Sequence, residues 1–201
     1  MAYYCHLWHN NAMKKIILAS SSPRRIEMMK KNGYEPLIIP ADINEEMPID
    51  ITPPAFVMYL SLKKALHVKN HSKDLIKNDW DKIIAADTIV LKNNNIIGKP
   101  CDEKEAFKTL SLLRNSSHHV LTGVCIIDRR TCINTCFYDI TKVYFKDISD
   151  DELTAYVNTP EPYDKAGGYA IHQTFSKYLD RIEGDFNNVM GLPWYKVKPF
   201  L

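Results

Sequence analysis

An apolar run that gives way to small hydroxyl residues and then to a helix pattern constrains this chain more than any other stretch. Ile16–Ala19 is typical of a buried strand, and Ser20-Ser21-Ser22 follow it directly. Pro23-Arg24-Arg25 then open a helix pattern that continues to about residue 32, since proline favours the first helical position. The sequence therefore predicts a strand, a short loop and a helix in succession.

This loop has two interpretations. Serine hydroxyls, free N–H groups at a helix N-terminus and guanidinium forks all suit phosphate, which makes Ser20, Ser22, Arg24 and Arg25 candidate ligands of an anion. Alternatively, Ser22 is an ordinary N-cap and the arginines are solvated, although positive charge at a helix N-terminus opposes the helix dipole. Taken alone, the loop favours neither.

The rest of the chain alternates strand and helix patterns without a repeat or a low-complexity tract. Strands are expected near 15–20, 35–41, 82–91, 96–97, 119–128 and 133–145, and helices near 23–32, 53–71, 102–114 and 149–158. Some connections are crossovers and others are hairpins. The predicted fold class is therefore α/β with a mixed sheet.

Composition and charge narrow the kind of protein. With 201 residues, 45% hydrophobic and 25% charged, the chain can bury a full core, and we expect one domain over residues 13–201. Residues 1–12 show no clear period and are interpreted as an N-terminal extension, with disorder as one explanation. The 26 basic and 24 acidic residues leave a net charge of +2, which indicates neither nucleic acid nor a membrane surface as partner.

Cysteine usage and the lack of targeting patterns predict a location. The five cysteines are odd in number and none forms a C-x-x-C pair, so we interpret them as ordinary thiols in a reducing compartment. No run approaches the roughly 20 apolar residues that cross a bilayer, and no signal-peptide core is visible. We expect a soluble, cytoplasmic protein.

Asp87 is the second informative residue. The residues on both sides of it in the 82–91 strand pattern are apolar, so its carboxylate is expected in a buried strand, where it needs a partner or a function. The structural alternative is a carboxylate at a frayed strand end, bonded to loop amides. We favour the functional interpretation.

Three further candidates, Glu45, Lys64 and Lys99, carry little information when each is considered alone. Glu45, beside Glu46, could join Asp87 in supplying the one or two carboxylates that usually hold Mg²⁺ while substrate phosphates complete its coordination. Lys64 and Lys99 could neutralise phosphate charge, although surface lysines and paired surface glutamates are frequent in any protein.

Together these residues carry a resemblance. Seven blocks occur in order: Leu18–Arg25, Asn44-Glu45-Glu46, Ala86–Val90, Gly98-Lys99-Pro100, Thr122-Gly123-Val124, Asp164–Tyr169 and Gly191-Leu192-Pro193. The set resembles the Maf family of nucleoside triphosphate pyrophosphatases, from about Met13 to Pro193. The resemblance implies an elongated α/β fold, similar to that of the inosine triphosphate pyrophosphatases, with a central cleft between two lobes. It also implies hydrolysis between the α and β phosphates with Mg²⁺ or Mn²⁺, and a homodimer is possible by analogy.

The resemblance also assigns roles. It places the family's phosphate loop on Ser20, Ser22, Arg24 and Arg25, its acidic metal-site residue on Glu45, its catalytic Asp on Asp87, and its lysines on Lys64 and Lys99. We expect Asp87 to act as general base, with metal coordination as a second role, while metal, Arg and Lys neutralise the phosphates. Lys99 and Glu45 are counted with it as catalytic.

Base preference follows the family branch that acts on dTTP and UTP. Thr88 fits that branch, but His172 stands where the branch has Gln, and Gln173 comes one residue late. If this segment is a strand, successive side chains point to opposite faces, so Gln173 cannot substitute without a bulge. His172 can bond a pyrimidine edge, or it can be a plain surface histidine.

Two other functions remain open. One is a nucleotide-binding regulator of cell division without turnover, although such a binder needs no base. The other is a purine nucleotide pyrophosphatase of the inosine triphosphate type, which would lack the Ser-Pro-Arg-Arg loop. Asp185 is a weak further candidate for the cleft, or only the cap of a following helix.

Overall fold

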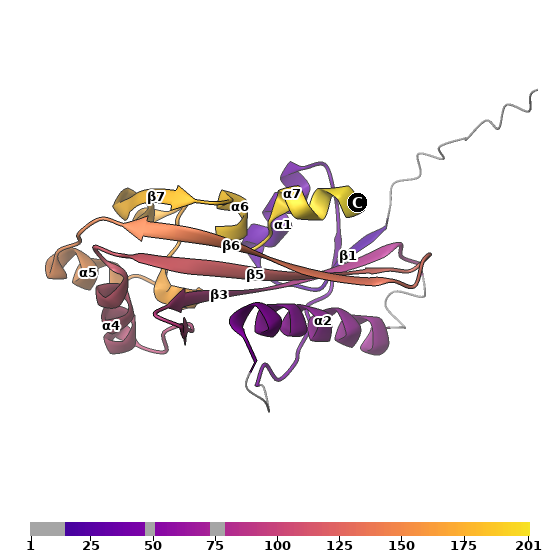
Figure 1. Ribbon diagram of the computed structural model, residues 1–201, viewed down its shortest axis with the longest axis horizontal. Coiled ribbons are helices and arrows are strands. Elements are labelled where there is room, and N and C mark those ends of the chain that lie inside the picture. Colours follow the sequence, from indigo (N-terminus) through magenta and orange to yellow (C-terminus); the bar gives the residue numbers. More distant parts are fainter. Residues whose placement is uncertain (1–14, 47–50, 73–78) are drawn as a thin grey trace, which may run out of the picture.

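A seven-stranded mixed sheet runs the length of the molecule, with helices on both faces (Figure 1). The computed structural model describes residues 15–46, 51–72 and 79–201. The N-terminal extension predicted over 1–12 lies outside the described residues. The strands are β1 (Ile16–Leu18), β2 (Leu37–Ile38), β3 (Lys82–Lys92), β4 (Asn95–Ile97), β5 (Ser117–Asp128), β6 (Asn134–Phe145) and β7 (Leu179–Glu183).

The strand order is β2-β1-β3-β5-β6-β7, with β4 paired to β3. β2, β1 and β3 are parallel to one another, while β3, β5, β6 and β7 pair antiparallel. The prediction of an α/β fold with an elongated mixed sheet is confirmed. β3, β5 and β6 are the long strands that extend through both ends of the molecule (Figure 1).

One edge of β3 lacks a strand partner along its middle. β1 pairs with β3 only at 82–84, and β4 pairs with it only at 90–92. Within the described residues, β3 from Ala85 to Ile89 therefore has a strand on one side only, which is β5. Ile84 accepts a hydrogen bond from the N–H of Ala19, so the main-chain groups of even-numbered residues point toward this edge.

Helices cover the two sheet faces unequally. The longer helices are α1 (Pro23–Lys31), α2 (Pro53–His71), α4 (Glu103–Leu113) and α5 (Asp150–Val157), and the short ones are α6 (Phe186–Val189) and α7 (Trp194–Val197). α2 lies below the sheet in Figure 1, while α1, α6 and α7 lie above it. α4 and α5 pack together at the end far from β1, against a core rich in aromatic residues.

The close approach of α2 to the sheet depends on Gly123 of β5. A Cβ atom at this position would lie 2.3 Å from the carbonyl carbon and the carbonyl oxygen of Val57 in α2. Only a glycine leaves room for the helix backbone there. Gly123 is the register partner of Asp87, so the helix is seated directly beside that carboxylate.

Most predicted elements are present, with boundaries shifted by a few residues. The two predicted helix starts at Asp102 and Ser149 carry side-chain caps, each accepting a hydrogen bond from the N–H three residues on. β2 is shorter than predicted, because Pro36 and Pro40 flank it and cannot donate to a sheet.

Two features differ from the sequence interpretation, and a third agrees with it. β7 and α7 were not predicted. Ile171 and His172 lie in a turn and not on a strand, so the strand-alternation argument against Gln173 does not apply. Cys101, Cys125, Cys132 and Cys136 are free thiols.

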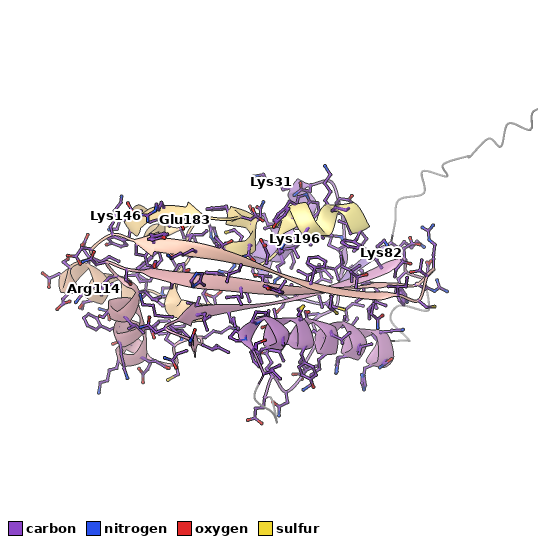
Figure 2. The ribbon with its side chains drawn as sticks, in the orientation of Figure 1. Lys31, Lys82, Arg114, Lys146, Glu183 and Lys196 are labelled. Carbon is purple, nitrogen blue, oxygen red and sulfur yellow. The ribbon has the colours of Figure 1, made fainter. Side chains whose placement is uncertain are left out.

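Charged side chains of both signs, among them Lys31, Arg114 and Glu183, lie around the outside of the ribbon (Figure 2). This mixture agrees with the nearly balanced charge of the sequence. In the described part of the chain, no helix has the length and apolar character needed to cross a membrane.

Candidate active site

A cleft of about 600 Å³ opens between the loop after β1, the middle of β3 and the segment 164–172. All ten residues that the sequence predicts for the site line it: Ser20, Ser22, Arg24, Arg25, Glu45, Lys64, Asp87, Thr88, Lys99 and His172. The open edge of β3 explains how one cleft can reach residues on both faces of the sheet. Asp87 faces α2, and its neighbour Thr88 faces α1 and α6.

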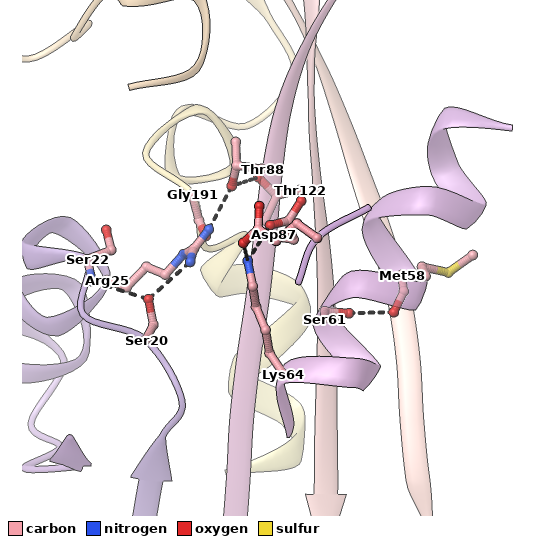
Figure 3. Close-up of polar contacts among 11 residues, drawn as sticks. Ser20, Ser22, Arg25, Met58, Ser61, Lys64, Asp87, Thr88, Thr122 and Gly191 are labelled. Carbon is pink, nitrogen blue, oxygen red and sulfur yellow. Dashed lines mark hydrogen bonds and ion pairs between the residues drawn. The ribbon is translucent and has the colours of Figure 1, made fainter. Parts of the chain in front are cut away.

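Arg25 is held by protein groups on the Thr88 side (Figure 3). Its Nε donates to the carbonyl of Gly191 at 2.8 Å, Nη1 to Ser20 Oγ at 3.1 Å and Nη2 to Thr88 Oγ1 at 3.0 Å. Three of the five N–H groups of this guanidinium are thus occupied. Burial lowers the pKa of Arg25 to about 10, against the opposing effect of Asp87, so it stays charged at neutral pH.

Thr88 continues this arrangement into the sheet. Its Oγ1 lies 3.0 Å from Oγ1 of Thr122, which itself donates to the carbonyl of Asn188 at 2.9 Å. Because each hydroxyl has one proton, Thr88 donates to Thr122 and accepts from Arg25. Gly191 closes the arrangement: it has φ of +98°, and a Cβ there would lie 3.3 Å from both Arg25 Nε and Thr88 Oγ1.

Arg24 differs from its neighbour. Within the described residues its guanidinium makes no hydrogen bond or ion pair, and it faces the cleft near Asp164 and Tyr169. Burial lowers the pKa of Arg24, while Asp164 and Tyr169 act in the opposite direction. Ser22 occupies the N-cap position of α1, yet its hydroxyl caps no N–H. Ser22 thus holds the N-cap position that the second interpretation gave it but makes no capping hydrogen bond, so its hydroxyl remains available to a ligand.

Lys64 links the two predicted carboxylates on the other side of β3. Its Nζ lies 2.6 Å from Asp87 Oδ1 (Figure 3) and 2.7 Å from Glu45 Oε1. Asp87 is buried, in agreement with its predicted place in an apolar strand, and it lies within the strand rather than at a frayed end. The carboxylate has the partner that its burial requires.

A divalent cation fits this donor set. Glu45 and Asp87 aim carboxylate oxygens at one point, where the ammonium of Lys64 stands as a cation. In the ranges that the structure describes, no group of three or more His, Cys, Asp and Glu side chains gathers. Mg²⁺ commonly uses one or two carboxylates, with substrate phosphates and water as its other ligands, so two are sufficient.

Lys99 and His172 lie toward the rim. Both are exposed, Lys99 after β4 and His172 in its turn. Partial burial, Arg24 and Lys165 lower the pKa of His172, which favours the neutral imidazole. A neutral ring can both donate and accept a hydrogen bond.

The sequence interpretation assigned no role to several cleft residues: Asp164, Lys165, Tyr169 and Gly191. All four belong to quoted motif blocks, so their signal was present without a chemical reason to select them. Lys165 is buried and pairs with Asp164, and its Nζ donates to the carbonyl of Glu161 at 2.7 Å. Asp185 does not line the cleft: it caps α6 by accepting from the N–H of Asn187 at 3.0 Å, as its structural interpretation predicted.

Several known proteins that are similar to this chain carry the name dTTP/UTP pyrophosphatase. A dTTP/UTP pyrophosphatase of Caldicellulosiruptor bescii is 44% identical over 189 residues, covering 94% of each chain. Its namesake from Pyrococcus furiosus is 42% identical over 181 residues, 90% of each chain. One from Bacillus cereus is 40% identical over 181 residues, 90% of this chain and 85% of its own. The family model described as Maf-like protein matches residues 15–201, and the chain therefore belongs to the Maf family.

Proposed function

We propose that this protein is a nucleoside triphosphate pyrophosphatase that hydrolyses dTTP and UTP to the monophosphate and pyrophosphate. The observation that carries the proposal is one cleft that unites Arg24, an arginine at a helix N-terminus without an ion-pair partner among the described residues, with a buried carboxylate paired to lysine. A triphosphate needs the first group, and activation of water needs the second. The names of the relatives supply the reaction and the bases.

Phosphate binding is assigned to the loop after β1. The hydroxyls of Ser20 and Ser22, the N–H groups of the first turn of α1 and the guanidinium of Arg24 would contact the phosphate oxygens. Arg25 fixes the Thr88 side of this site through its hydrogen bonds and presents its remaining N–H groups to the same ligand. Lys64 and Lys99 add positive charge for the leaving pyrophosphate, which gains one negative charge as its bond breaks.

Asp87 is assigned as the general base. Water attacks the α phosphorus, its proton passes to the Asp87 carboxylate, and the bond between the α phosphorus and the bridging oxygen breaks, releasing pyrophosphate. Glu45 and Asp87 would hold Mg²⁺ or Mn²⁺. When bound, such a cation neutralises phosphate charge and orients the phosphates. Base choice is assigned to Thr88 and His172. Thr88 would act through its hydrogen bond with Arg25.

Three properties complete the proposal. Residues 13–201 form one catalytic unit with two lobes around the cleft. The protein is proposed to work in the cytoplasm, where cysteines such as these stay reduced. The nucleotide is its small-molecule partner, and a homodimer is proposed by analogy with the family.

The test is a panel of canonical and modified triphosphates with Mg²⁺ or Mn²⁺ in ¹⁸O-labelled water. We expect dTTP and UTP to give monophosphate and pyrophosphate, with the label in the monophosphate because water attacks the α phosphorus. Label in the pyrophosphate, or orthophosphate as the only product, would contradict the proposed bond choice. Binding without turnover would indicate the regulator, and turnover of inosine triphosphate alone would indicate the purine enzyme.

A further inference from the structure

The ammonium of Lys64 lies where two carboxylates converge. It contacts Asp87 Oδ1 at 2.6 Å and Glu45 Oε1 at 2.7 Å, both ordinary distances for a charge-assisted hydrogen bond. The side chains of Lys64 and Asp87 are only 13% and 10% exposed, so water screens their attraction weakly. Lys64 is thus the counter-ion of both carboxylates.

The three groups differ in how firmly they are held. Asp87 lies in the central strand β3, and Lys64 lies in the interior of α2, whose position is fixed by its contact with Gly123. Glu45 lies on the segment after β2, and its side chain is 57% exposed. The lysine stem has four carbons and several rotatable bonds, so its ammonium can reach a new partner nearby.

The same two oxygens are the ligands that a divalent cation requires. An ammonium and a divalent cation cannot share them, because two positive charges would lie a few ångströms apart in a poorly screened site. We propose that Lys64 is a resident cation that competes with the metal at Glu45 and Asp87, and that its release to the phosphates couples metal binding to nucleotide binding. This inference rests on the proposed function.

The cleft gives the released ammonium a new partner only when nucleotide is present. In the described residues, the other carboxylate that lines the cleft is Asp164, which is already paired with Lys165. A triphosphate carries several negative charges, so it can accept Lys64 while the metal takes its place between the carboxylates. Metal and nucleotide should therefore bind with positive coupling, each making the site better for the other.

The first experiment measures Mn²⁺ binding alone, without nucleotide, from the electron paramagnetic resonance signal of free Mn²⁺. Lys64→Met keeps the length and the apolar stem and removes the competing charge. We expect it to bind Mn²⁺ roughly ten- to a hundredfold more tightly than the wild type, since close charge pairs of this kind have coupling energies of that order.

Two variants act as controls. Lys63→Met removes the same charge one residue away on the same helix, where Nζ donates to the carbonyl of Asn44 at 2.5 Å and, in the part of the chain that the structure describes, forms no ion pair with a carboxylate. It should change Mn²⁺ affinity much less than Lys64→Met does, because its half-buried ammonium meets a neutral carbonyl and does not lie between the two carboxylates. Lys64→Arg restores a cation and should return Mn²⁺ binding to the weak wild-type level.

The second experiment follows the wild-type ammonium directly and needs no variant that might fail to fold. The ¹⁵N resonance of Lys64 Nζ, assigned by its loss in Lys64→Arg, is recorded with Mg²⁺, with α,β-imido-dTTP and with both. We expect Mg²⁺ alone to leave the resonance in place, and Mg²⁺ with the analogue to shift it.

Either experiment can overturn the inference. Folded Lys64→Met that binds Mn²⁺ no more tightly than the wild type would show that the lysine does not compete. A Lys64 resonance that Mg²⁺ with the analogue leaves unchanged would show that the ammonium stays between the carboxylates. The Mn²⁺ measurement contains no nucleotide, so tighter binding by Lys64→Met in a protein that fails to hydrolyse dTTP or UTP would contradict only the proposed function.

Discussion

Two neighbouring residues of β3, Asp87 and Thr88, point to opposite faces of the sheet, and each is joined to a different cation. Asp87 pairs with the flexible ammonium of Lys64, whose other partner is the carboxylate of Glu45. Thr88 accepts from the planar guanidinium of Arg25, which also bonds a serine hydroxyl and a main-chain carbonyl. The Asp87 face can therefore rearrange when its cation changes partner, whereas the Thr88 face is held in place by several hydrogen bonds.

The comparison shows that two positively charged side chains in one cleft can have different roles, depending on the groups that hold them. Lysine on the Asp87 face can exchange partners at small cost, because its ammonium has no preferred plane. Arginine on the Thr88 face is fixed by three directions at once, so its displacement would leave a buried relay of hydroxyls without its donor. We therefore expect changes on the first face to alter chemistry and changes on the second to alter stability.

The largest expected effect is on the Asp87 face. Asp87→Asn should lower kcat by about 10²- to 10⁴-fold, the usual contribution of a general base. The fold should remain, because asparagine has the same shape and Lys64 keeps its contact with Glu45. Steady-state kinetics and thermal unfolding measure the two effects. A variant with nearly wild-type kcat would refute the assignment of the base.

Gly123→Ala tests whether α2 must touch the sheet beside Asp87. The added Cβ would lie 2.3 Å from main-chain atoms of Val57, so the helix has to move, and we expect a loss of about 3 kcal/mol in the free energy of unfolding. Urea unfolding measures this loss. Gly98→Ala is the matched control, because nothing lies within 4 Å of its added Cβ. Equal stability of the two variants would mean that the contact is not required.

The Thr88 face also carries a pH-sensitive group, His118. It is buried, its Nε2 lies 2.7 Å from the hydroxyl of Tyr169, and burial lowers its pKa from 6.5 to about 3. Below pH 6.5 the unfolded chain binds a proton here that the native protein refuses, so stability falls as the pH drops toward 3.

The corresponding loss for His118 is about 1.4 kcal/mol per pH unit once the unfolded histidine is charged, or about 2 kcal/mol at pH 5. His118→Phe removes this proton, so its stability should depend less on pH by that amount. Urea unfolding at several pH values between 7 and 4 provides the comparison. Parallel curves for the two proteins would exclude His118 as the source.

Arg24 and Arg25 allow the most direct comparison between a side chain that faces the cleft and one that is bound by protein groups. Arg25→Ala should lower the free energy of unfolding by about 2 kcal/mol, because it leaves Thr88 and the Gly191 carbonyl without their donor. Arg24→Ala should leave stability within about 0.5 kcal/mol while raising KM and lowering kcat. If both variants lose stability equally, or if Arg24→Ala has wild-type kinetics with every nucleotide, the distinction is wrong.

Much of the fold was predictable because its patterns are local. The Asp102 and Ser149 caps and the apolar run around Asp87 each depend on residues close in sequence. β7 escaped prediction because a short edge strand with exposed residues has no strong pattern. The shape of the contact at Gly123 was also invisible, since the sequence shows a glycine but not the helix that meets it.

The sequence predicted which residues belong to the site. It did not predict which of them are already bound to other protein groups. Arg24 and Arg25 are the same residue type in the same motif, and only their different directions on α1 separate a free guanidinium from a bound one. Glu45 was predicted to join Asp87 at a metal and Lys64 to neutralise phosphate, yet the contact of Lys64 with both carboxylates depends on three segments that meet only in the folded chain. Motifs identify chemical groups, whereas long-range packing decides which of them are already engaged.

The unpaired edge of β3 has a consequence for how this cleft can change over evolution. The N–H and C=O groups of Ala86 and Thr88 point toward that edge, where no strand of the described residues pairs with them. Their presence does not depend on which side chain occupies either position, proline excepted. Mutation can therefore change the lysines, arginines and histidine around the opening, while the main-chain groups of Thr88 remain in the cleft as a polar feature that side-chain substitution does not remove.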